Sequence, residues 1–458
     1  MKSDSGSNKM AALVVATGGS FLTPLMGSSM NIALPSIGQE FSMDAVLLSW
    51  VTTSYILATA VVLIPFGRLA DIYGRKRIFT YGIWIYIVAN ILAAISPSGV
   101  VLISCRVLLG IGGAMIFGTG VAILTSVFPA GERGRVLGIN IGAIYLGLSI
   151  GPFVGGFLTQ HFGWRSIFLV NVPLGLIVAG AVLWKLKGEW AEAKGEKLDI
   201  NGGIIYGLAI VALIYGLSLL PAIWGILLVA MGILGFSAFV KWEMRVKYPV
   251  LDIGLFRHNR LFALSNLAAL FNYSGAFAAA FLLSLYLQYV KGLNPQDAGL
   301  ILVCMPAVQC ILAPLVGRLS DRIEPRIISS AGLALTSSAL FSLSLLTETT
   351  TLRFIIPSLM LLGSGIALFA SPNQNAIMSS VSKRSYGVAS GTLATMRQIG
   401  MMFSMVTAML MFTAYMGRVQ ITPEYYPLFL RSVKAAFVVF SGACFGGMVA
   451  SLARGRMR

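Results

Sequence analysis

The chain has 458 residues, of which 57% are hydrophobic and only 11% charged, and its mean hydropathy is +0.86. Soluble domains carry about a quarter charged residues, so this composition excludes a soluble protein and predicts a helical protein that crosses a membrane many times. The formal net charge of +17 would suit a nucleic-acid ligand, but the positions of the basic residues, given below, argue against one.

Fourteen apolar runs are long enough to cross a membrane as helices, because a span needs about 20 apolar residues. An even number of spans places both termini on the same side of the membrane. The runs lie at about residues 10–34, 47–67, 78–96, 99–127, 136–158, 166–186, 201–220, 222–241, 261–289, 296–317, 326–346, 353–379, 387–414 and 433–453.

Lysine and arginine are distributed unevenly between the two sides of these spans. Of the 33, 25 lie on the side of the N-terminus, 6 lie on the opposite side, and Arg106 and Arg397 lie inside spans. Because Lys and Arg are enriched in cytoplasmic loops, we expect a multi-pass protein of the cell membrane, plasma or inner, with both termini cytoplasmic. The basic excess then reports topology, and we expect no nucleic-acid partner.

A partial repeat indicates two bundles of helices. The segment Gly67–Arg77, GRLADIYGRKR, recurs in degraded form as GRLSDRIEPR at Gly317–Arg326, 250 residues and eight spans later. Two six-helix bundles would separate the copies by six spans, so the surplus pair is assigned to 201–220 and 222–241. We therefore predict an all-α polytopic membrane protein with 14 transmembrane helices, as two six-helix bundles with two extra helices between them. The predicted domains are the N-terminal bundle at 1–186, the linker with extra helices 7 and 8 at 187–242, and the C-terminal bundle at 243–458.

The first copy of the repeat lies in the loop between the second and third spans. Gly67 and Gly74 permit a tight turn, and Asp71 can accept hydrogen bonds from a helix N-terminus or pair with a basic side chain. The spacing, which continues into Arg75, resembles the G-x-L-x-D-x-x-G-R-[KR] motif of the major facilitator superfamily. The resemblance implies a latch that stabilises one access state, whereas a positively charged loop that only sets topology would not need the glycines and the aspartate.

The partners of this latch are less well defined by the sequence. Arg133 or Arg135, in the next cytoplasmic loop, is the expected partner of Asp71. In the second copy, Asp321 keeps the position of the aspartate, but Glu324 replaces the second glycine. An equal latch on that side is therefore not expected.

Arg106 lies inside the fourth span, in the run RVLLGIGGA. An arginine inside a span is costly and usually faces a cavity or a partner, although one near the end of a span can also extend to the interface. The run resembles the R-x-x-Q-G-x-G-x-A pattern of the same superfamily, except that Leu109 replaces the glutamine. We expect Arg106, together with Tyr55 of the second span, to line or tune a substrate cavity, and Arg106 to be a cavity charge or part of proton coupling.

The fifth span contains the run GLSIGPFVGG. Glycines four residues apart lie on one face, where another helix can approach closely, and the proline bends the helix. The pattern GxxxGPxxGG resembles the antiporter motif of drug exporters of this superfamily, and the following WRSIFLVNVPLG is similar to the signature of its 14-helix drug–proton antiporter branch, the multidrug efflux type. Ordinary packing of small residues is the alternative. The motif residues are Gly147, Gly151, Pro152, Gly155 and Gly156.

Polar residues recur inside spans of the second bundle. Asn272 and Gln288 lie in the ninth span, where Tyr286–Gln288 resembles the Y-L-Q of the family, and Arg397 lies in the thirteenth span. The segments around Arg397 and at Ser371–Asn375 look like the C-terminal half of the 14-helix branch. These residues are candidates to line the cavity, but hydrogen bonding between helices would explain them equally well.

The first span departs from the family. Its run LMGSSMNIALP keeps Asn31, another cavity candidate, but has Met26 where the branch usually has an acid. Exchange of protons for a cation needs a buried carboxylate, and all sixteen acidic residues fall in loops, tails or span ends. Such a cavity suits neutral, aromatic or anionic amphiphiles better than lipophilic cations.

The motifs together predict a secondary active transporter that exports small amphiphilic compounds, drug-like or lipid-like, by alternating access. We expect the protein to function as a monomer in membrane lipid. We expect an ion gradient, that of protons, to drive transport, and we expect no metal or other cofactor. The alternatives are an exporter of neutral or anionic metabolites with weak or no proton coupling, and a facilitator on the same scaffold.

Other classes of protein fit the sequence poorly. An enzyme in the membrane would need clustered catalytic side chains, but the chain has two histidines, and its four cysteines lie in apolar runs without metal or disulfide spacing. A phosphate-binding Gly-x4-Gly-Lys-[Ser/Thr] run, which ATP drive would require, is absent from the sequence.

Overall fold

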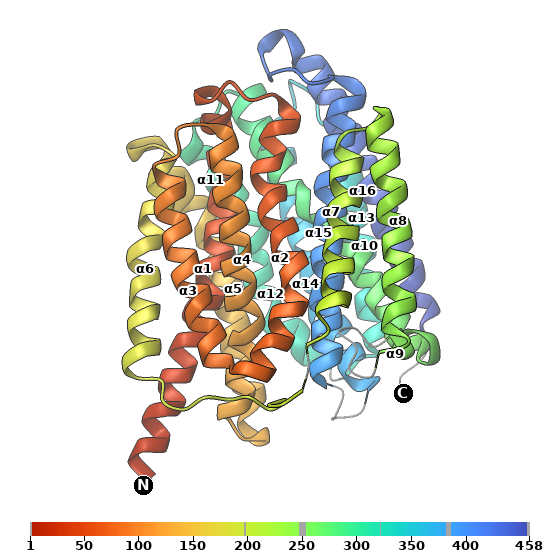
Figure 1. Cartoon of the computed structure of the whole chain (residues 1–458). Coiled ribbons are helices and arrows are strands. Elements are labelled where there is room, and N and C mark those ends of the chain that lie inside the picture. Colours follow the sequence, from red (N-terminus) through yellow and green to blue (C-terminus); the bar gives the residue numbers. More distant parts are fainter. Residues whose placement is uncertain (1, 197, 247–252, 321, 382–385, 456–458) are drawn as a thin grey trace.

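A computed structural model describes residues 2–196, 198–246, 253–320, 322–381 and 386–455 of the chain. These residues form helices and short connections, and they contain no strand. The long helices run side by side, and both ends of the chain lie at the same end of the bundle (Figure 1). We call this end the terminal end and the opposite one the far end.

The helical elements follow one another with short connections. In chain order they are α1 (Lys2–Glu40), α2 (Ala45–Tyr73), α3 (Arg75–Ala94), α4 (Gly99–Val127), α5 (Ala130–Phe162), α6 (Arg165–Trp184), α7 (Ile200–Ser218), α8 (Ile223–Glu243), α9 (Ile253–His258), α10 (Arg260–Leu285), the π-turn η1 (Tyr286–Val290), α11 (Pro295–Leu302), α12 (Cys304–Ser320), α13 (Pro325–Leu343), α14 (Leu352–Ser379), α15 (Tyr386–Tyr415), the 3₁₀ turn η3 (Pro423–Tyr425) and α16 (Tyr426–Ala453).

Within the described ranges, fourteen segments are long and apolar enough to cross a membrane, which confirms the predicted number. Two details differ from the prediction: the short α9 precedes α10, and the tenth span is divided into α11 and α12 at Val303. Pro306 explains the division, because it has no N–H to donate to the carbonyl four residues earlier.

The helices pack in two groups that meet along the middle of the molecule. Helices α1 to α6 pack against one another, as do helices α10 to α16, and α1, α2 and α5 meet α10, α15, α11 and α12 across the middle. Of the remaining helices, the short α9 packs on α10, while α7 and α8 pack as a hairpin, and α7 lies against both α2 and α15. We call α1–α6 the first group, α10–α16 the second group and α7–α8 the hairpin.

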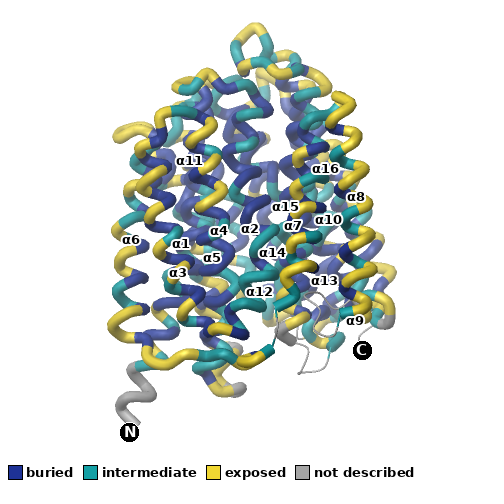
Figure 2. Tube along the Cα trace, viewed as in Figure 1, coloured by how far each residue is buried: buried dark blue, intermediate teal, exposed yellow. Residues whose placement is uncertain are grey.

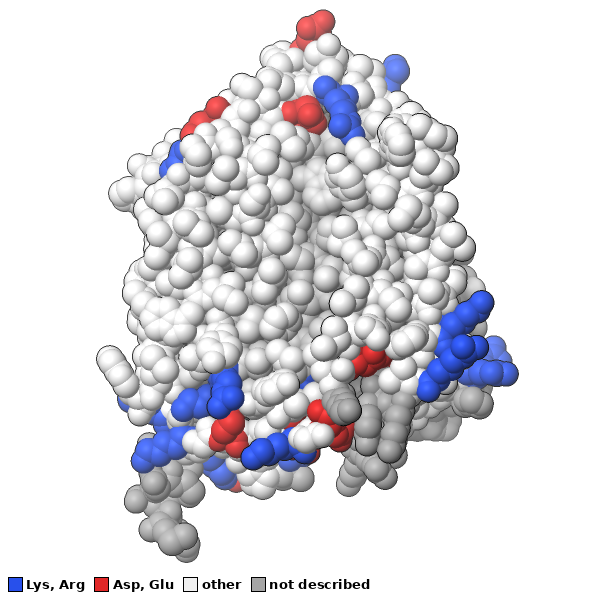
Figure 3. Space-filling view, in the orientation of Figure 1, with Lys and Arg blue, Asp and Glu red and all other residues white. Residues whose placement is uncertain are grey.

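Burial and charge follow the arrangement expected in a membrane. The inner faces of the helices are buried, while α6 and α8 expose much of their outer surface (Figure 2). That surface is apolar, with Leu234 of α8 69% exposed and Ile177 of α6 67% exposed. On the face shown in Figure 3, charged side chains gather at the two ends and leave the middle uncharged.

Candidate functional site

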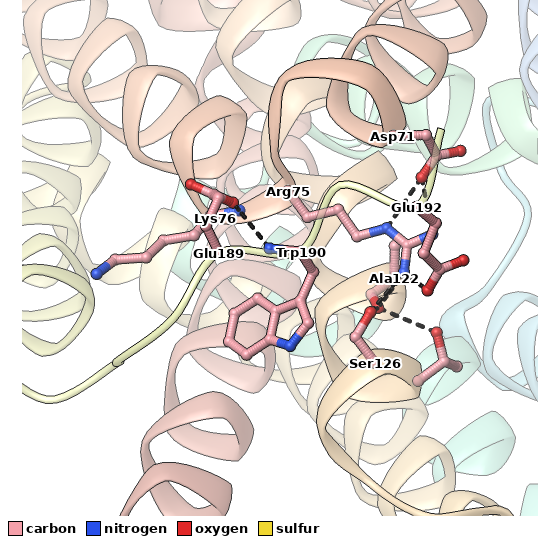
Figure 4. A network of polar contacts seen from close by, with 9 residues as sticks. Asp71, Arg75, Lys76, Ala122, Ser126, Glu189, Trp190 and Glu192 are labelled. Atoms are coloured by element: carbon pink, nitrogen blue, oxygen red, sulfur yellow. Dashed lines mark hydrogen bonds and ion pairs between the residues drawn. The ribbon is translucent and has the colours of Figure 1, made fainter. Parts of the chain in front are cut away.

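The predicted latch lies where α2 turns into α3 at the terminal end. Arg75 is only 8% exposed, and its Nε and Nη2 donate to Oδ1 of Asp71 at 2.9 and 2.7 Å. Its Nη1 donates to Ser126 of α4 and, at 2.9 Å, to Glu192 in the linker between α6 and α7 (Figure 4). The guanidinium therefore joins α2, α3, α4 and this linker.

The partner of Asp71 in the structure is not the expected one. Among the described residues, Asp71 forms its ion pair with Arg75, and Arg133 donates instead to the carbonyl of Phe128 at 3.0 Å. Two residues four apart can pair without any rearrangement of a second loop, so the local partner is favoured over Arg133 or Arg135.

The two glycines of the latch have different surroundings. Gly74 has a φ of +116°, which disfavours any side chain, and a Cβ there would collide with the carboxylate of Glu189. Gly67 has no atom within 4 Å of where a Cβ would lie. Asp321, the counterpart of Asp71 in the second copy, lies outside the described residues.

A different buried arginine holds the terminal end of the second group. Arg454, just after α16, is 3% exposed and donates to Asn373 Oδ1 at 2.8 Å and to Ser265 and Ser329 at 3.2 and 3.3 Å. Burial lowers the pKa of this guanidinium to about 10, against the opposing effect of Glu324. The position was not singled out in the sequence because its partners lie on three other helices.

The glycine-rich motif of α5 makes two interfaces. A Cβ on Gly147 would lie 2.6 Å from the carbonyl oxygen of Phe21, and one on Gly155 would lie 2.6 Å from Cα of Ser29, so both glycines pack on α1. Gly151 is also on that face, where its carbonyl accepts from Ser29 Oγ at 2.8 Å. Backbones can approach this closely only where side chains are absent.

The rest of the motif reaches the second group. A Cβ on Gly156 would lie 2.5 Å from the carbonyl oxygen of Pro295, and one on Gly299 would collide with the carbonyl of Pro152. The motif therefore makes close packing possible at two interfaces, that of α5 with α1 inside the first group and that of α5 with α11 between the groups.

Tyr55 and Arg106 lie together inside the first group. The guanidinium carbon of Arg106 is 4.6 Å from the centre of the Tyr55 ring, and its Nε donates to the carbonyl of Val51 at 2.9 Å. Arg106 is 1% exposed, and its buried Nη1 finds no hydrogen-bond partner among the described residues. It is thus a buried cation of the span, and not an arginine that extends to the interface.

Hydrogen bonds from side chains of α10 and η1 to backbone carbonyls of α1 join the two groups in their far half. We call these contacts the seam. They are Ser284 Oγ to Asn31 O at 2.6 Å, Gln288 Nε2 to Ile32 O at 3.0 Å, and Tyr289 Oη to Pro35 O at 3.3 Å.

The local sequence explains why the seam forms here. Pro35 has no N–H, so the carbonyl of Asn31 lacks its helical donor and can accept from Ser284. The π-turn η1, with its wider i→i+5 turn, brings Tyr289 round to the face of Ser284 and Gln288. The seam thus brings the predicted Asn31 and Gln288 together between the groups, while Oδ1 of Asn31 stays buried without a partner.

Arg397 and Asn272 lie apart from the seam. Arg397 Nη2 donates to Gln374 Oε1 of α14 at 3.1 Å, and its guanidinium carbon is 5.6 Å from the centre of the Tyr273 ring. Asn272, one residue before Tyr273 on α10, is fully buried, and neither polar atom of its side-chain amide has a hydrogen-bond partner in the part of the chain that the structure describes. Of this pair, Arg397 is the one on a partly exposed face.

Met26, in the place of the usual acid, occupies a polar niche of the first group. It is 1% exposed, and its sulfur accepts from Asn171 Nδ2 at 3.4 Å. Oδ1 of Asn171 accepts from Tyr86 Oη at 3.0 Å. Asn171 belongs to the WRSIFLVNVPLG run, so the two family motifs meet at this point.

The described residues contain no cluster of His, Cys, Asp or Glu that could hold a metal ion. Their acidic side chains lie in loops or in the end turns of helices. Sequence reasoning missed Ser284, Tyr289 and Asn171 as site residues. The proline at position 35 is the one signal that could have pointed to Ser284, because it leaves a carbonyl to be satisfied by another element.

Comparison with known proteins agrees with these features. The family model of the Major Facilitator Superfamily matches residues 16–405 and 266–457. The riboflavin transporter RibZ of Clostridioides difficile is 30% identical over 87% of this chain and 87% of its own. The multidrug resistance protein Stp of Mycobacterium tuberculosis (strain CDC 1551 / Oshkosh) is 32% identical over 84% of this chain and 73% of its own.

Solved structures agree in fold. A peptide transporter POT in complex with alafosfalin superposes with a TM-score of 0.72 at 15% identity, over 97% of this chain and 93% of that one. A bacterial homolog of the human lysosomal transporter Spinster gives 0.70 at 18% identity, over 98% and 99%. The chain belongs to the Major Facilitator Superfamily of membrane transporters, and its relatives include proteins named for multidrug resistance and multidrug efflux.

Proposed function

We propose that this transporter exports small amphiphilic compounds by alternating access, and that neutral and anionic amphiphiles are preferred over lipophilic cations. Relatives named as multidrug resistance and efflux proteins support export of amphiphiles. The relative named as a riboflavin transporter supports an aromatic substrate without positive charge.

One observation carries the charge preference. The described spans bury Arg106 and hold Arg397 between helices, but their acidic side chains lie only at helix ends. In a low-dielectric interior, an unopposed positive charge repels a cation and attracts an anion strongly. A lipophilic cation would therefore have to enter without a counter-charge.

Arg397, Tyr273 and Gln374 form the polar wall of the proposed substrate site. The buried Nε of Arg397 has no hydrogen-bond partner among the described residues, so an anionic or carbonyl oxygen that reached it during transport would satisfy it. The adjacent ring of Tyr273 offers a flat surface for an aromatic substrate. Arg106 and Tyr55 would tune the potential from the first group, and Asn31 and Gln288 would act through the seam.

Alternating access would proceed by rocking of the first group against the second. The seam, together with a bond from Gln420 Nε2 to the carbonyl of Ser42 at 2.9 Å, joins the groups in the far half. These far-half contacts support our proposal that, with the terminal end in the cytoplasm, this arrangement is an inward-facing state.

The division of the chain at 1–186, 187–242 and 243–458 gives the moving parts of this cycle, and one monomer contains both groups. We propose the proton gradient as the driving force. Without a central carboxylate, the coupling of transport to protons would run through Asp71 and Arg106 or would be weak. A facilitator on the same scaffold is the second candidate function.

A growth-inhibition panel in a pump-deficient host tests the substrate class. Cells expressing the protein should gain resistance to anionic and neutral aromatic compounds, and should gain little resistance to lipophilic cations of similar size. Expression of the Arg397→Ala variant is the control for non-specific effects. Strong resistance confined to cations would overturn the proposed preference.

A further inference from the structure

The linker between α6 and α7 is fastened to the α2–α3 turn along most of its length. We call Leu186–Glu196 the strap; it runs beneath the first group at the terminal end (Figure 1). Backbone and side chains both take part. The backbone of the strap makes three contacts: Arg75 N to Trp190 O at 2.9 Å, Ala193 N to Asp71 O at 2.9 Å, and the side-chain Nζ of Lys76 to Leu186 O at 2.6 Å.

Three carboxylates of the strap bind three different parts of the basic turn. Glu189, which lies beside Lys76 in Figure 4, accepts from the backbone N–H groups of Lys76 and Arg77 at 2.8 and 3.1 Å. It thereby caps the N-terminus of α3, where an anion is favoured. Glu192 pairs with the guanidinium of Arg75. Glu196 pairs with Arg68, near the end of α2.

These contacts hold the strap without being needed to neutralise the latch. Arg75 already pairs with Asp71, so the loss of Glu192 would not leave a buried charge unpaired. The side chain of Glu192 is 68% exposed and that of Glu196 is 35% exposed. Ion pairs as exposed as these are screened by water and salt and are individually weak, so the strap depends on several of them together.

The strap leads directly into α7, which begins at Ile200. Helix α7 packs along α2: Tyr206 Oη donates to the carbonyl of Ala60 at 3.3 Å, and the rings of Trp50 and Tyr215 lie 5.8 Å apart. Among the described residues, a hydrogen bond of similar length joins it to the second group, from Arg418 to the carbonyl of Ser218 at 3.4 Å. The hairpin is therefore attached to the first group at both ends of α7.

We propose that the strap fastens the α7–α8 hairpin to the first group, so that the hairpin moves with that group during transport and slides against α15. The inference rests on the rocking motion of the proposed function. It assigns a mechanical role to the two extra helices and to Glu189, Glu192 and Glu196, namely to keep one side of the interface between the groups covered while the groups move.

Distances between spin labels test this role. Labels are placed at Tyr81 of α3, Ile204 of α7 and Ile327 of α13, which are 54 to 56% exposed, in full-length protein whose four native cysteines are replaced by alanine. In the parent, the Tyr81–Ile204 distance distribution should be narrow. In the triple variant Glu189→Gln, Glu192→Gln and Glu196→Gln it should broaden about twofold, because the screened pairs that hold α7 are lost.

A matched control distinguishes the loss of the strap contacts from the loss of a negative charge elsewhere at the terminal end. Glu132 lies at the same end and pairs with Lys9 outside the strap, so Glu132→Gln should leave the Tyr81–Ile204 distribution unchanged. An unchanged distribution in the triple variant would overturn the strap. So would a hairpin that keeps a fixed distance to Ile327 while its distance to Tyr81 varies with added substrate.

The same labels report on the rocking motion separately. The Tyr81–Ile327 distance spans the two groups and should change with substrate whether or not the strap is intact. If this distance never changes, the alternating-access proposal fails. The strap is still judged on its own, by the width of the Tyr81–Ile204 distribution in the triple variant.

Discussion

At the scale of single residues, the proposed substrate preference depends on two arginines. Arg106 is buried against Tyr55 inside the first group, and Arg397 lies between Gln374 and Tyr273 in the second. Their surroundings differ: Arg106 is enclosed, whereas Arg397 is partly exposed, and each has one buried nitrogen without a hydrogen-bond partner among the described residues. We therefore assign Arg397 to substrate contact and Arg106 to the electrostatics of the first group.

Alanine at either position tests this assignment. Arg106→Ala and Arg397→Ala should each abolish transport while the protein is still produced and inserted, because the positive potential of the cavity is removed. Arg397→Lys should keep part of the transport of anions, since it keeps the charge but loses the planar donor set. Transport assays on purified protein provide the measurement, and wild-type transport in both alanine variants would remove these residues from the site.

The Met26 niche gives a second prediction at this scale. In Met26→Asp, the new carboxylate would lie beside the Nδ2 donor of Asn171, and a buried acid has a raised pKa that permits protonation near neutral pH. The variant should gain proton-driven export of a lipophilic cation that the parent transports poorly. Met26→Asn, equally polar but uncharged, is the control, and a cation rate that is the same in both variants would contradict the prediction.

At the scale of elements, we propose that the far-half contacts between the groups decide which state is populated. They combine the seam of α1 with α10 and the close approach of α5 to α11. Both use backbone carbonyls as acceptors or contact atoms, so their geometry depends on helix position more than on side-chain identity. Small changes there should shift the balance between states and leave the fold intact.

The α5–α11 approach is tested with a pair of glycines on one helix. Gly156→Val would push a side chain into the carbonyl of Pro295, and overpacking of this kind costs about 1–3 kcal/mol. We expect it to prevent closure of the far end and to abolish transport. Gly142→Val, where no atom lies within 4 Å, should be tolerated. The measurement is the transport rate of both variants in vesicles. Equal rates would show that the contact between α5 and α11 is unimportant for transport.

The seam is tested by removal of one donor. Ser284→Ala leaves the Asn31 carbonyl without its 2.6 Å hydrogen bond, and one hydrogen bond contributes about 1 kcal/mol, or roughly a fivefold change in an equilibrium. The far end should therefore open more often. Thiol labelling of a cysteine introduced in the far-end loop should become faster, whereas Ser338→Ala on the exposed surface of α13 should leave the labelling rate unchanged. A rate unaffected by Ser284→Ala would refute the role of the seam.

At the scale of the whole molecule, the sequence predicted most of the fold. Hydropathy predicted fourteen spans because each span must be apolar over its full length, whatever it packs against. The motifs predicted the family, since their glycines and prolines act on the local backbone. Local signals of this kind can be read from the sequence without knowledge of the partners.

The sequence did not predict contacts between distant residues. Glu192 binds Arg75 across 117 positions, and Asn171 meets Met26 across 145, and nothing in either local sequence marks the partner. For the same reason the expected partner of Asp71 was taken from the next loop, although Arg75 lies one turn away. The role of the candidate cavity residues stays a prediction, and the seam in which Ser284 binds the Asn31 carbonyl and Gln288 binds the Ile32 carbonyl required the three-dimensional arrangement.

The central claim is that this member of the superfamily transports neutral and anionic amphiphiles in preference to lipophilic cations. The most direct measurement uses purified protein in vesicles with an imposed pH gradient, and compares a fluorescent anionic amphiphile, a neutral flavin and a fluorescent cation of similar size. The account predicts transport of the first two at rates well above that of the cation, with a weak response to the gradient. Vigorous cation transport that collapses when the proton gradient is dissipated would contradict it.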